Sequence, residues 1–237
     1  IVDQANFKLS TSNKNLNDIL SVPGKKSITL PLGQVNIKRK VKSVKVILRT
    51  CTSELIMDQN KKRLFECEKN EYTFRTLKSI IYSIKKAQKY LKDVNFEIHV
   101  TDTNSSQNDI SEIKNILNNS KINHKFSSVD LKKFENKIKS GYSKAKFSNM
   151  ANFYNSLLIA KNEEADILYF VEDDYIHSPD TMTEMIFSYE KFSTIFEKEI
   201  ILLPADYPYL YTKDENTKIY LGEKNHWRLV SESLVTF

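Results

Sequence analysis

The apolar, β-prone run Ile167–Val171 ends abruptly in three consecutive acids, Glu172, Asp173 and Asp174. Such a run is typical of a strand that is buried on both faces of a sheet, as in parallel α/β proteins. Three carboxylates at its carboxyl end are costly unless they are solvated or paired with a cation. Because ligands of open α/β sheets bind at this end of the strands, the run indicates either an Mg²⁺ or Mn²⁺ site or a strand with a solvated acidic turn.

Strand-like and helical segments alternate along the rest of the chain. We expect strands at 44–49, 96–100, 125–129, 167–171, 200–203, 219–221 and 228–237. We expect helices at 74–92, around 110–117, at 147–161, and from an N-cap at Ser178 with Pro179 in the first turn. This order predicts an α/β fold with a mostly parallel sheet, made mixed by its last strands, and helices on both faces. In the third helix, apolar spacing predicts an inward face of Met150, Tyr154, Leu157 and Leu158.

The composition changes near Ser43. Residues 1–42 are rich in Asn, Ser and Lys around a short apolar patch at 28–32, and we expect an irregular N-terminal extension with one edge strand. Residues 43–237 are expected to form one domain. The sequence ends inside the apolar run 228–237, which suggests a C-terminal truncation.

The chain carries 36 basic and 30 acidic residues, a formal net charge of +6. The lysines alternate with acids and Asn, which is typical of a solvated surface that also attracts phosphate-bearing ligands or an anionic membrane surface. No nucleic-acid-binding motif accompanies them, and no apolar run approaches the length of a membrane span. Cys51 and Cys67 lack a metal-binding spacing, so reduced thiols are expected. These features favour a cytoplasmic protein, with peripheral association at the inner face of the membrane as a further expectation.

Three motifs follow one another in a recognisable order. The second expected strand ends in Asp102–Ser105, a later helix carries Ser148–Asn152, and the fourth strand ends in Glu172–Asp174. Over 44–175 this order resembles the donor-binding half of GT-A-fold glycosyltransferases, especially the large inverting family 2, in which the last motif is the metal-binding DxD motif. The tail 222–228 is similar to a segment of poorly characterised bacterial members. The resemblance implies a GT-A, Rossmann-like domain.

The resemblance also implies roles for individual side chains. Asp174 would coordinate Mn²⁺ or Mg²⁺ together with the donor diphosphate, and His226 would complete the shell of the metal. Glu172 would contact the ribose or its bound water, and Asp102 the base or the ribose. The remaining residues expected to bind the nucleotide-sugar are Thr50, Lys146, Asp173, Trp227 and Arg228.

Each of these residues has an alternative explanation in local structure. Asp102 is equally well explained as an Asx turn that caps the next helix. His226 fits a polar position at the start of a strand, and Trp227 fits core packing. Lys146 and Arg228 are alternatively ordinary surface cations.

The catalytic base is the least defined part of the expected site. Asp206 is the candidate, because it follows the apolar run 200–203, although a turn residue before Pro208 is the alternative. The sequence thus predicts a metal-dependent, inverting glycosyltransferase that moves a sugar from a UDP- or GDP-linked donor to a hydroxyl of a glycan or another acceptor. Two alternatives remain. One is a catalytically silent carbohydrate- or partner-binding module, and the other is a sugar nucleotidyltransferase, although 49–53 lacks the glycine of a phosphate loop.

Overall fold

The computed structural model describes residues 25, 27–29, 33–53, 67–205 and 219–229. The chain forms two compact units. The first unit comprises 42–85 and 94–179; the second comprises the described parts of 1–41, 86–93 and 180–237. The predicted division into an extension over 1–42 and a domain over 43–237 stays a prediction.

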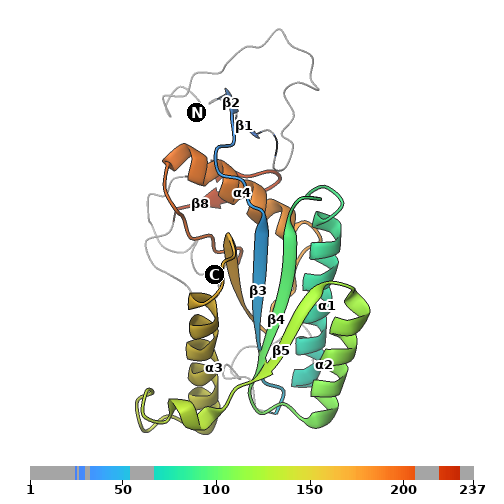
Figure 1. Cartoon of the computed structure of the whole chain (residues 1–237), viewed down its shortest axis with the longest axis vertical. Helices are drawn as coiled ribbons and strands as arrows, with labels where there is room; N and C mark the ends of the chain where they lie inside the picture. The colour runs from blue at the N-terminus through green and yellow to red at the C-terminus, as the bar shows by residue number, and fades with distance from the viewer. Residues whose placement is uncertain (1–24, 26, 30–32, 54–66, 206–218, 230–237) are drawn as a thin grey trace. The chain divides into compact units, whose positions relative to one another are not determined.

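A four-stranded, all-parallel sheet forms the centre of the first unit (Figure 1). Its strands are β3 (Ser43–Thr50), β4 (Asn95–Asp102), β5 (Asn123–Ser128) and β6 (Ile167–Glu172), in the spatial order β5-β4-β3-β6. All four lie where the sequence predicts strands. The chain adds β4 and β5 on one side of β3 and then places β6 on the other side. The direction of winding therefore changes between β3 and β6, which is a topological switch point.

Helices cover both faces of this sheet (Figure 1). The helices α1 (Lys69–Ala87) and α2 (Gln107–Ser120) lie on one face, and α3 (Lys144–Lys161) lies on the other. The α1–α2 side holds the apolar core, with buried Val44, Val46, Leu48, Phe96, Ile98, Val100, Tyr169 and Val171 from the strands and Leu77, Ile80, Ile84, Ile113 and Leu117 from the helices. The α3 side is polar, because alternate strand positions there carry Lys45, Arg49, His99 and Thr101.

The orientation predicted for α3 is wrong. Met150, Tyr154, Leu157 and Leu158 are exposed, and the buried face is instead Ser148, Ala151, Asn152 and Ser156. The cause is the polar face of the sheet beneath the helix. Asn152 donates hydrogen bonds to the carbonyl oxygens of Thr50 (3.3 Å) and Thr101 (2.9 Å), and the Thr101 hydroxyl donates to Asn152 Oδ1 at 2.6 Å. Small polar side chains satisfy these buried groups, which an apolar face would leave unpaired.

The second unit contains one described helix, α4 (Thr181–Phe196), and two antiparallel strand pairs. The strand β1 (Ser27–Thr29) pairs with β2 (Gly33–Val35), and β7 (Ile219–Leu221) pairs with β8 (His226–Arg228). The edge strand expected in the patch 28–32 and the strand at 219–221 are thus found. Within the described residues these strands form sheets of their own, so the central sheet is parallel rather than mixed.

Two further predictions fail in this unit. The run 200–203 forms no strand, and Ile201 is 76% exposed. A short apolar run becomes a strand only where a neighbour accepts its hydrogen bonds, and none of the described strands pairs with it. The N-cap of α4 is Asp180 rather than Ser178, so Pro179 precedes the helix. None of the helices in the described ranges combines the length and apolarity that crossing a bilayer requires.

Candidate functional site

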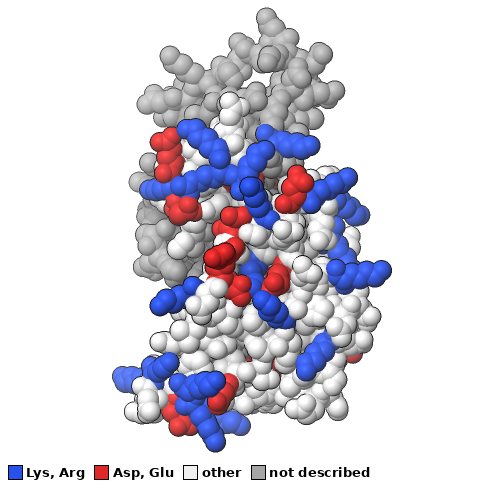
Figure 2. All heavy atoms as spheres, in the orientation of Figure 1, with Lys and Arg blue, Asp and Glu red and all other residues white. Residues whose placement is uncertain are grey.

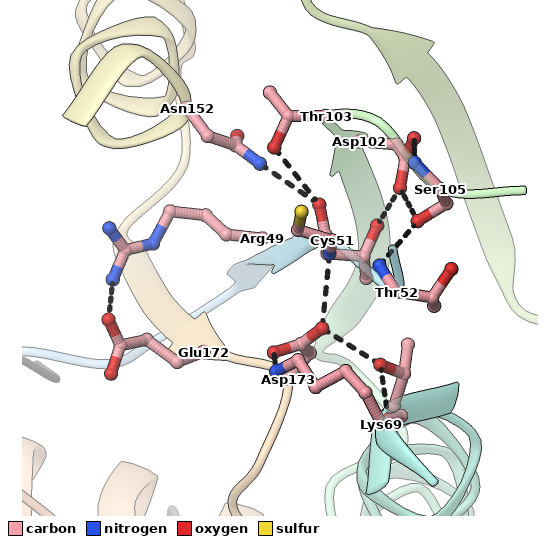
Figure 3. Close-up of polar contacts among 12 residues, drawn as sticks. Arg49, Cys51, Thr52, Lys69, Asp102, Thr103, Ser105, Asn152, Glu172 and Asp173 are labelled. Atoms are coloured by element: carbon pink, nitrogen blue, oxygen red, sulfur yellow. Dashed lines mark hydrogen bonds and ion pairs between the residues drawn. The ribbon is translucent and has the colours of Figure 1, made fainter. Parts of the chain in front are cut away.

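The carboxyl ends of three neighbouring strands bring four of the predicted site residues to one edge of the sheet (Figure 3). Thr50 ends β3 and lies opposite Asp102, which ends β4. Glu172 ends β6 and lies opposite Arg49 of β3, and Asp173 follows it. The parallel register therefore gathers these side chains at the switch point between β3 and β6.

Asp173 is enclosed by hydrogen-bond donors of the protein itself. The residue is 6% exposed, and its carboxylate accepts hydrogen bonds from the Cys51 backbone N–H (3.1 Å) and the Thr73 hydroxyl (2.8 Å). The Lys69 ammonium forms an ion pair with the other carboxylate oxygen. Lys69 and Thr73 lie at the start of α1, where the helix dipole favours a negative charge. Asp173 thus joins the turn after β6 to β3 and α1.

Asp102 is also held by local donors. Its carboxylate is 2% exposed and accepts hydrogen bonds from the Thr50 hydroxyl (2.7 Å), the Ser105 hydroxyl (2.5 Å) and the Ser105 backbone N–H (3.2 Å). Burial raises the pKa of Asp102, and these hydrogen bonds act in the opposite direction. The helix that follows is capped by Ser106, whose hydroxyl oxygen accepts from the Asp109 N–H at 3.1 Å. Asp102 therefore orders the turn between β4 and α2 without capping the helix.

Glu172 forms an ion pair with Arg49 across the sheet. Arg49 Nη2 lies 2.9 Å from Glu172 Oε1, and the guanidinium carbon lies 4.9 Å from the centre of the Phe153 ring on α3. Burial raises the pKa of Glu172 and lowers the pKa of Arg49, and the attraction between the two groups opposes both shifts. Among the residues that the structure describes, Arg49 Nε is buried without a hydrogen-bond partner, so this guanidinium retains an unused donor there.

Asp174 differs from the two acids before it because its side chain is exposed. It lies in the turn after β6, and its charge acts on both Arg49 and Glu172. In the described ranges no three His, Cys, Asp or Glu side chains gather as a metal ion would require.

Lys146 lies in the first turn of α3, and its ammonium is 4.3 Å from the centre of the Tyr142 ring. It is exposed and stacks as a cation–π pair. Its predicted contact with a diphosphate stays a prediction.

The late segment belongs to the second unit and is organised by the buried Glu184 of α4. The Glu184 carboxylate accepts hydrogen bonds from Trp227 Nε1 (3.0 Å), the Glu223 N–H (3.2 Å) and the Lys224 N–H (2.8 Å). The indole N–H of Trp227 thus has a hydrogen-bond partner within the second unit. Gly222 is required beside it, because a Cβ there would overlap Glu184 Oε1.

The other predicted residues of this region also belong to the second unit. His226 is exposed at the start of β8, and Arg228 ends the same strand. The pairing of His226 with Asp174 on one metal ion joins residues of different units and stays a prediction. Asp206, the candidate base, lies outside the described residues.

The sequence reasoning missed the partners of the acids. Arg49, Lys69 and Thr73 were not singled out, although each binds a predicted site carboxylate. A signal was present for all three. Arg49 is a charged residue that interrupts an apolar strand next to its end, and Lys69 and Thr73 stand four residues apart, on one face of a helix.

Comparisons with known proteins assign no family to the chain. No family model matches the sequence, and a search of curated proteins finds no match either.

Proposed function

We propose that the first unit binds a nucleotide-sugar and that the chain transfers the sugar to an acceptor hydroxyl, as a GT-A-like glycosyltransferase. One observation carries the proposal: the acids Glu172–Asp174 follow β6 at the switch point between β3 and β6. Open α/β sheets bind their ligands in this place. The orphaned donor of Arg49, buried beside Glu172, adds a group suited to an anionic ligand.

In this proposal the residues at the carboxyl edge of the sheet have different roles. Asp102 and Thr50 border the nucleoside, and Arg49 with Glu172 lies between the nucleoside and the diphosphate. Asp174, the exposed acid, faces the diphosphate and supplies a carboxylate to Mg²⁺ or Mn²⁺. A bound ion of this kind would neutralise charge on the diphosphate leaving group. Asp206 remains the candidate base for the acceptor hydroxyl.

The carboxylates at the carboxyl edge of the sheet suit a cation that binds together with its substrate. Asp173 is already surrounded by three donors of the protein, and Glu172 is paired with Arg49. Asp174 is the exposed acid of the triplet. Mg²⁺ is commonly held by one or two carboxylates, substrate phosphates and water, and Asp174 would provide one such carboxylate.

The test is calorimetric titration of the protein with UDP-, GDP- and CMP-sugars, with and without Mn²⁺. We expect one nucleotide class to bind, and Asp174→Asn to abolish the gain in affinity that Mn²⁺ provides. Glu164→Gln is the matched control, because Glu164 is an exposed acid that precedes β6 whereas Asp174 follows it. Binding of none of the three classes would refute the proposal. An equal Mn²⁺ effect in both variants would refute the role of Asp174.

A binding module without catalysis is the second candidate. It is favoured by the hydrogen bonds that Asp102 and Asp173 accept within the protein, since carboxylates that hold the fold together are poorly placed for chemistry. A turnover assay with the bound donor separates the two functions. Release of the nucleoside diphosphate in the presence of an acceptor supports the transferase, and tight donor binding without release supports the module.

A further inference from the structure

The helix α3 presents an apolar stripe to solvent. Met150, Tyr154, Leu157 and Leu158 stand at positions i, i+4, i+7 and i+8, which is one face of a helix, and each is between 38% and 41% exposed. The opposite face, Ser148, Ala151, Asn152 and Ser156, is buried on the sheet. A helix at a protein surface normally has the reverse arrangement. Exposed apolar side chains that form a continuous stripe indicate an interaction surface.

The same part of the chain concentrates positive charge. Residues 131–161 contain seven lysines and one acid, Glu135, so their net charge of +6 equals that of the whole chain. They form the 3-10 helix η2 (Leu131–Phe134), a connecting segment, and α3, which contains no acidic residue. Figure 2 shows basic side chains gathered over the end of the first unit that η2 and the connecting segment form in Figure 1.

We propose that α3 and the lysines of 132–146 dock the first unit on the surface of an anionic lipid bilayer. The stripe would enter the interface between headgroups and acyl chains, and the lysines would lie among the anionic headgroups. Lys144 and Lys146 stand at the beginning of the helix and Lys161 at its end, so the apolar stripe is flanked by cations at both ends. An apolar face with lysines at its margins is the arrangement of interfacial helices.

The positive charge and the apolar stripe together favour an anionic bilayer over a nucleic acid or a second copy of the chain. A nucleic acid would satisfy the lysines, but its phosphates would gain nothing from Met150 or Leu157. A second copy of the chain would cover the stripe, but it would bring two sets of seven lysines together, and like charges repel. An anionic bilayer complements both features of the surface.

Flotation with lipid vesicles tests the proposal on the full chain. We expect binding to vesicles of phosphatidylcholine and phosphatidylglycerol in equal parts, no binding to phosphatidylcholine alone, and weaker binding as salt rises. Replacing Lys132, Lys139 and Lys144 by Gln should lower the partition coefficient about a hundredfold, since each basic residue near the surface contributes about fivefold. The double change Leu157→Gln and Leu158→Gln should lower it roughly tenfold.

Matched controls come from exposed residues of the same types elsewhere. Replacing Lys78, Lys85 and Lys89 by Gln removes the same charge outside the proposed surface. Tyr82→Gln with Tyr90→Gln removes two apolar groups that are 60% and 62% exposed. Equal losses in the control and α3 variants would overturn the proposal, as would the absence of binding to anionic vesicles. A concentration-dependent dimer that the leucine changes abolish, without any vesicle binding, would assign the surface to a second copy instead. Binding of single-stranded RNA that the lysine changes abolish, again without vesicle binding, would assign it to nucleic acid.

Discussion

A hydrogen bond of 2.8 Å joins the Thr73 hydroxyl, near the start of α1, to the carboxylate of Asp173, the residue that follows β6. The same carboxylate accepts from the Cys51 N–H and pairs with Lys69. Three segments that are far apart in the sequence therefore meet at one buried acid. Asp174, the next residue, is exposed. Two consecutive acids thus have different surroundings, and their substitution should have different consequences.

Asp173→Ala should lower the free energy of unfolding by about 3 kcal/mol, because it leaves a lysine and two further donors without their buried acceptor. Asp174→Ala should change it by no more than about 0.5 kcal/mol, since the side chain is exposed. Urea unfolding followed by circular dichroism measures both. Similar values for the two variants would contradict the structural role of Asp173.

The buried His177 should make stability depend on pH. Its ring lies 2.9 Å from the Tyr169 hydroxyl and 3.4 Å from the Ser79 hydroxyl, and burial lowers the pKa of His177 from 6.5 to about 4. Between these two values the unfolded chain binds a proton that the folded chain does not, so stability falls as pH falls from 6.5 to 4. The loss due to this group should reach about 3 kcal/mol at pH 4.

Unfolding measured at pH 7 and at pH 4.5 isolates the contribution of His177 when the wild type is compared with variants. His177→Gln should reduce the difference in stability between the two pH values. If His177→Gln retains the full difference, another group carries the pH dependence.

Gly222→Ala should destabilise the second unit. A Cβ at Gly222 would overlap Glu184 Oε1 and would lie 2.7 Å from both Ser188 Oγ and Trp227 Nε1. The hydrogen bond from Trp227 to Glu184 would break, at a cost of about 2 kcal/mol. Trp227 is the single tryptophan of the chain, so its fluorescence reports the change directly.

Gly141→Ala is the control for Gly222→Ala. Gly141 has a φ of +90°, but a Cβ there would meet no atom within 4 Å. It should therefore cost only the backbone strain, about 1 kcal/mol, and leave Trp227 fluorescence unchanged. A shift in the emission of Trp227 in this variant, or none in Gly222→Ala, would contradict the contact.

The sequence predicted the sheet of the first unit well, because its signals are local. The apolar run Ile167–Val171 became β6, and the alternating run at 96–100 became part of β4. The orientation of α3 was missed, because periodicity shows which residues share a face but not what that face meets. Here the sheet offers the Thr50 and Thr101 carbonyls, and Asn152 satisfies them.

The candidate site, too, was predicted only in part. The acids after β6 and β4 were predicted from their positions at strand ends. Their donors were not, because Lys69 stands 104 residues from Asp173 and reaches it only through the order of the strands. The order of the strands in the sheet is not a local property, so it cannot be deduced from the residues around Lys69 or Asp173.

The last prediction concerns Asp102, and it rests on the proposed function. Asp102 Oδ1 already accepts from two hydroxyls, whereas among the described residues Oδ2 accepts only from the Ser105 N–H. The nucleoside of a bound nucleotide-sugar would therefore donate a hydrogen bond to Oδ2. Asp102→Ala should raise the dissociation constant of the nucleotide-sugar about tenfold. Ser105→Ala removes one hydroxyl that holds the carboxylate and should cost about 1 kcal/mol of stability with little effect on donor affinity. Calorimetry and urea unfolding on both variants separate the roles. If Asp102→Ala loses stability but binds the donor as the wild type does, this carboxylate serves only the turn between β4 and α2.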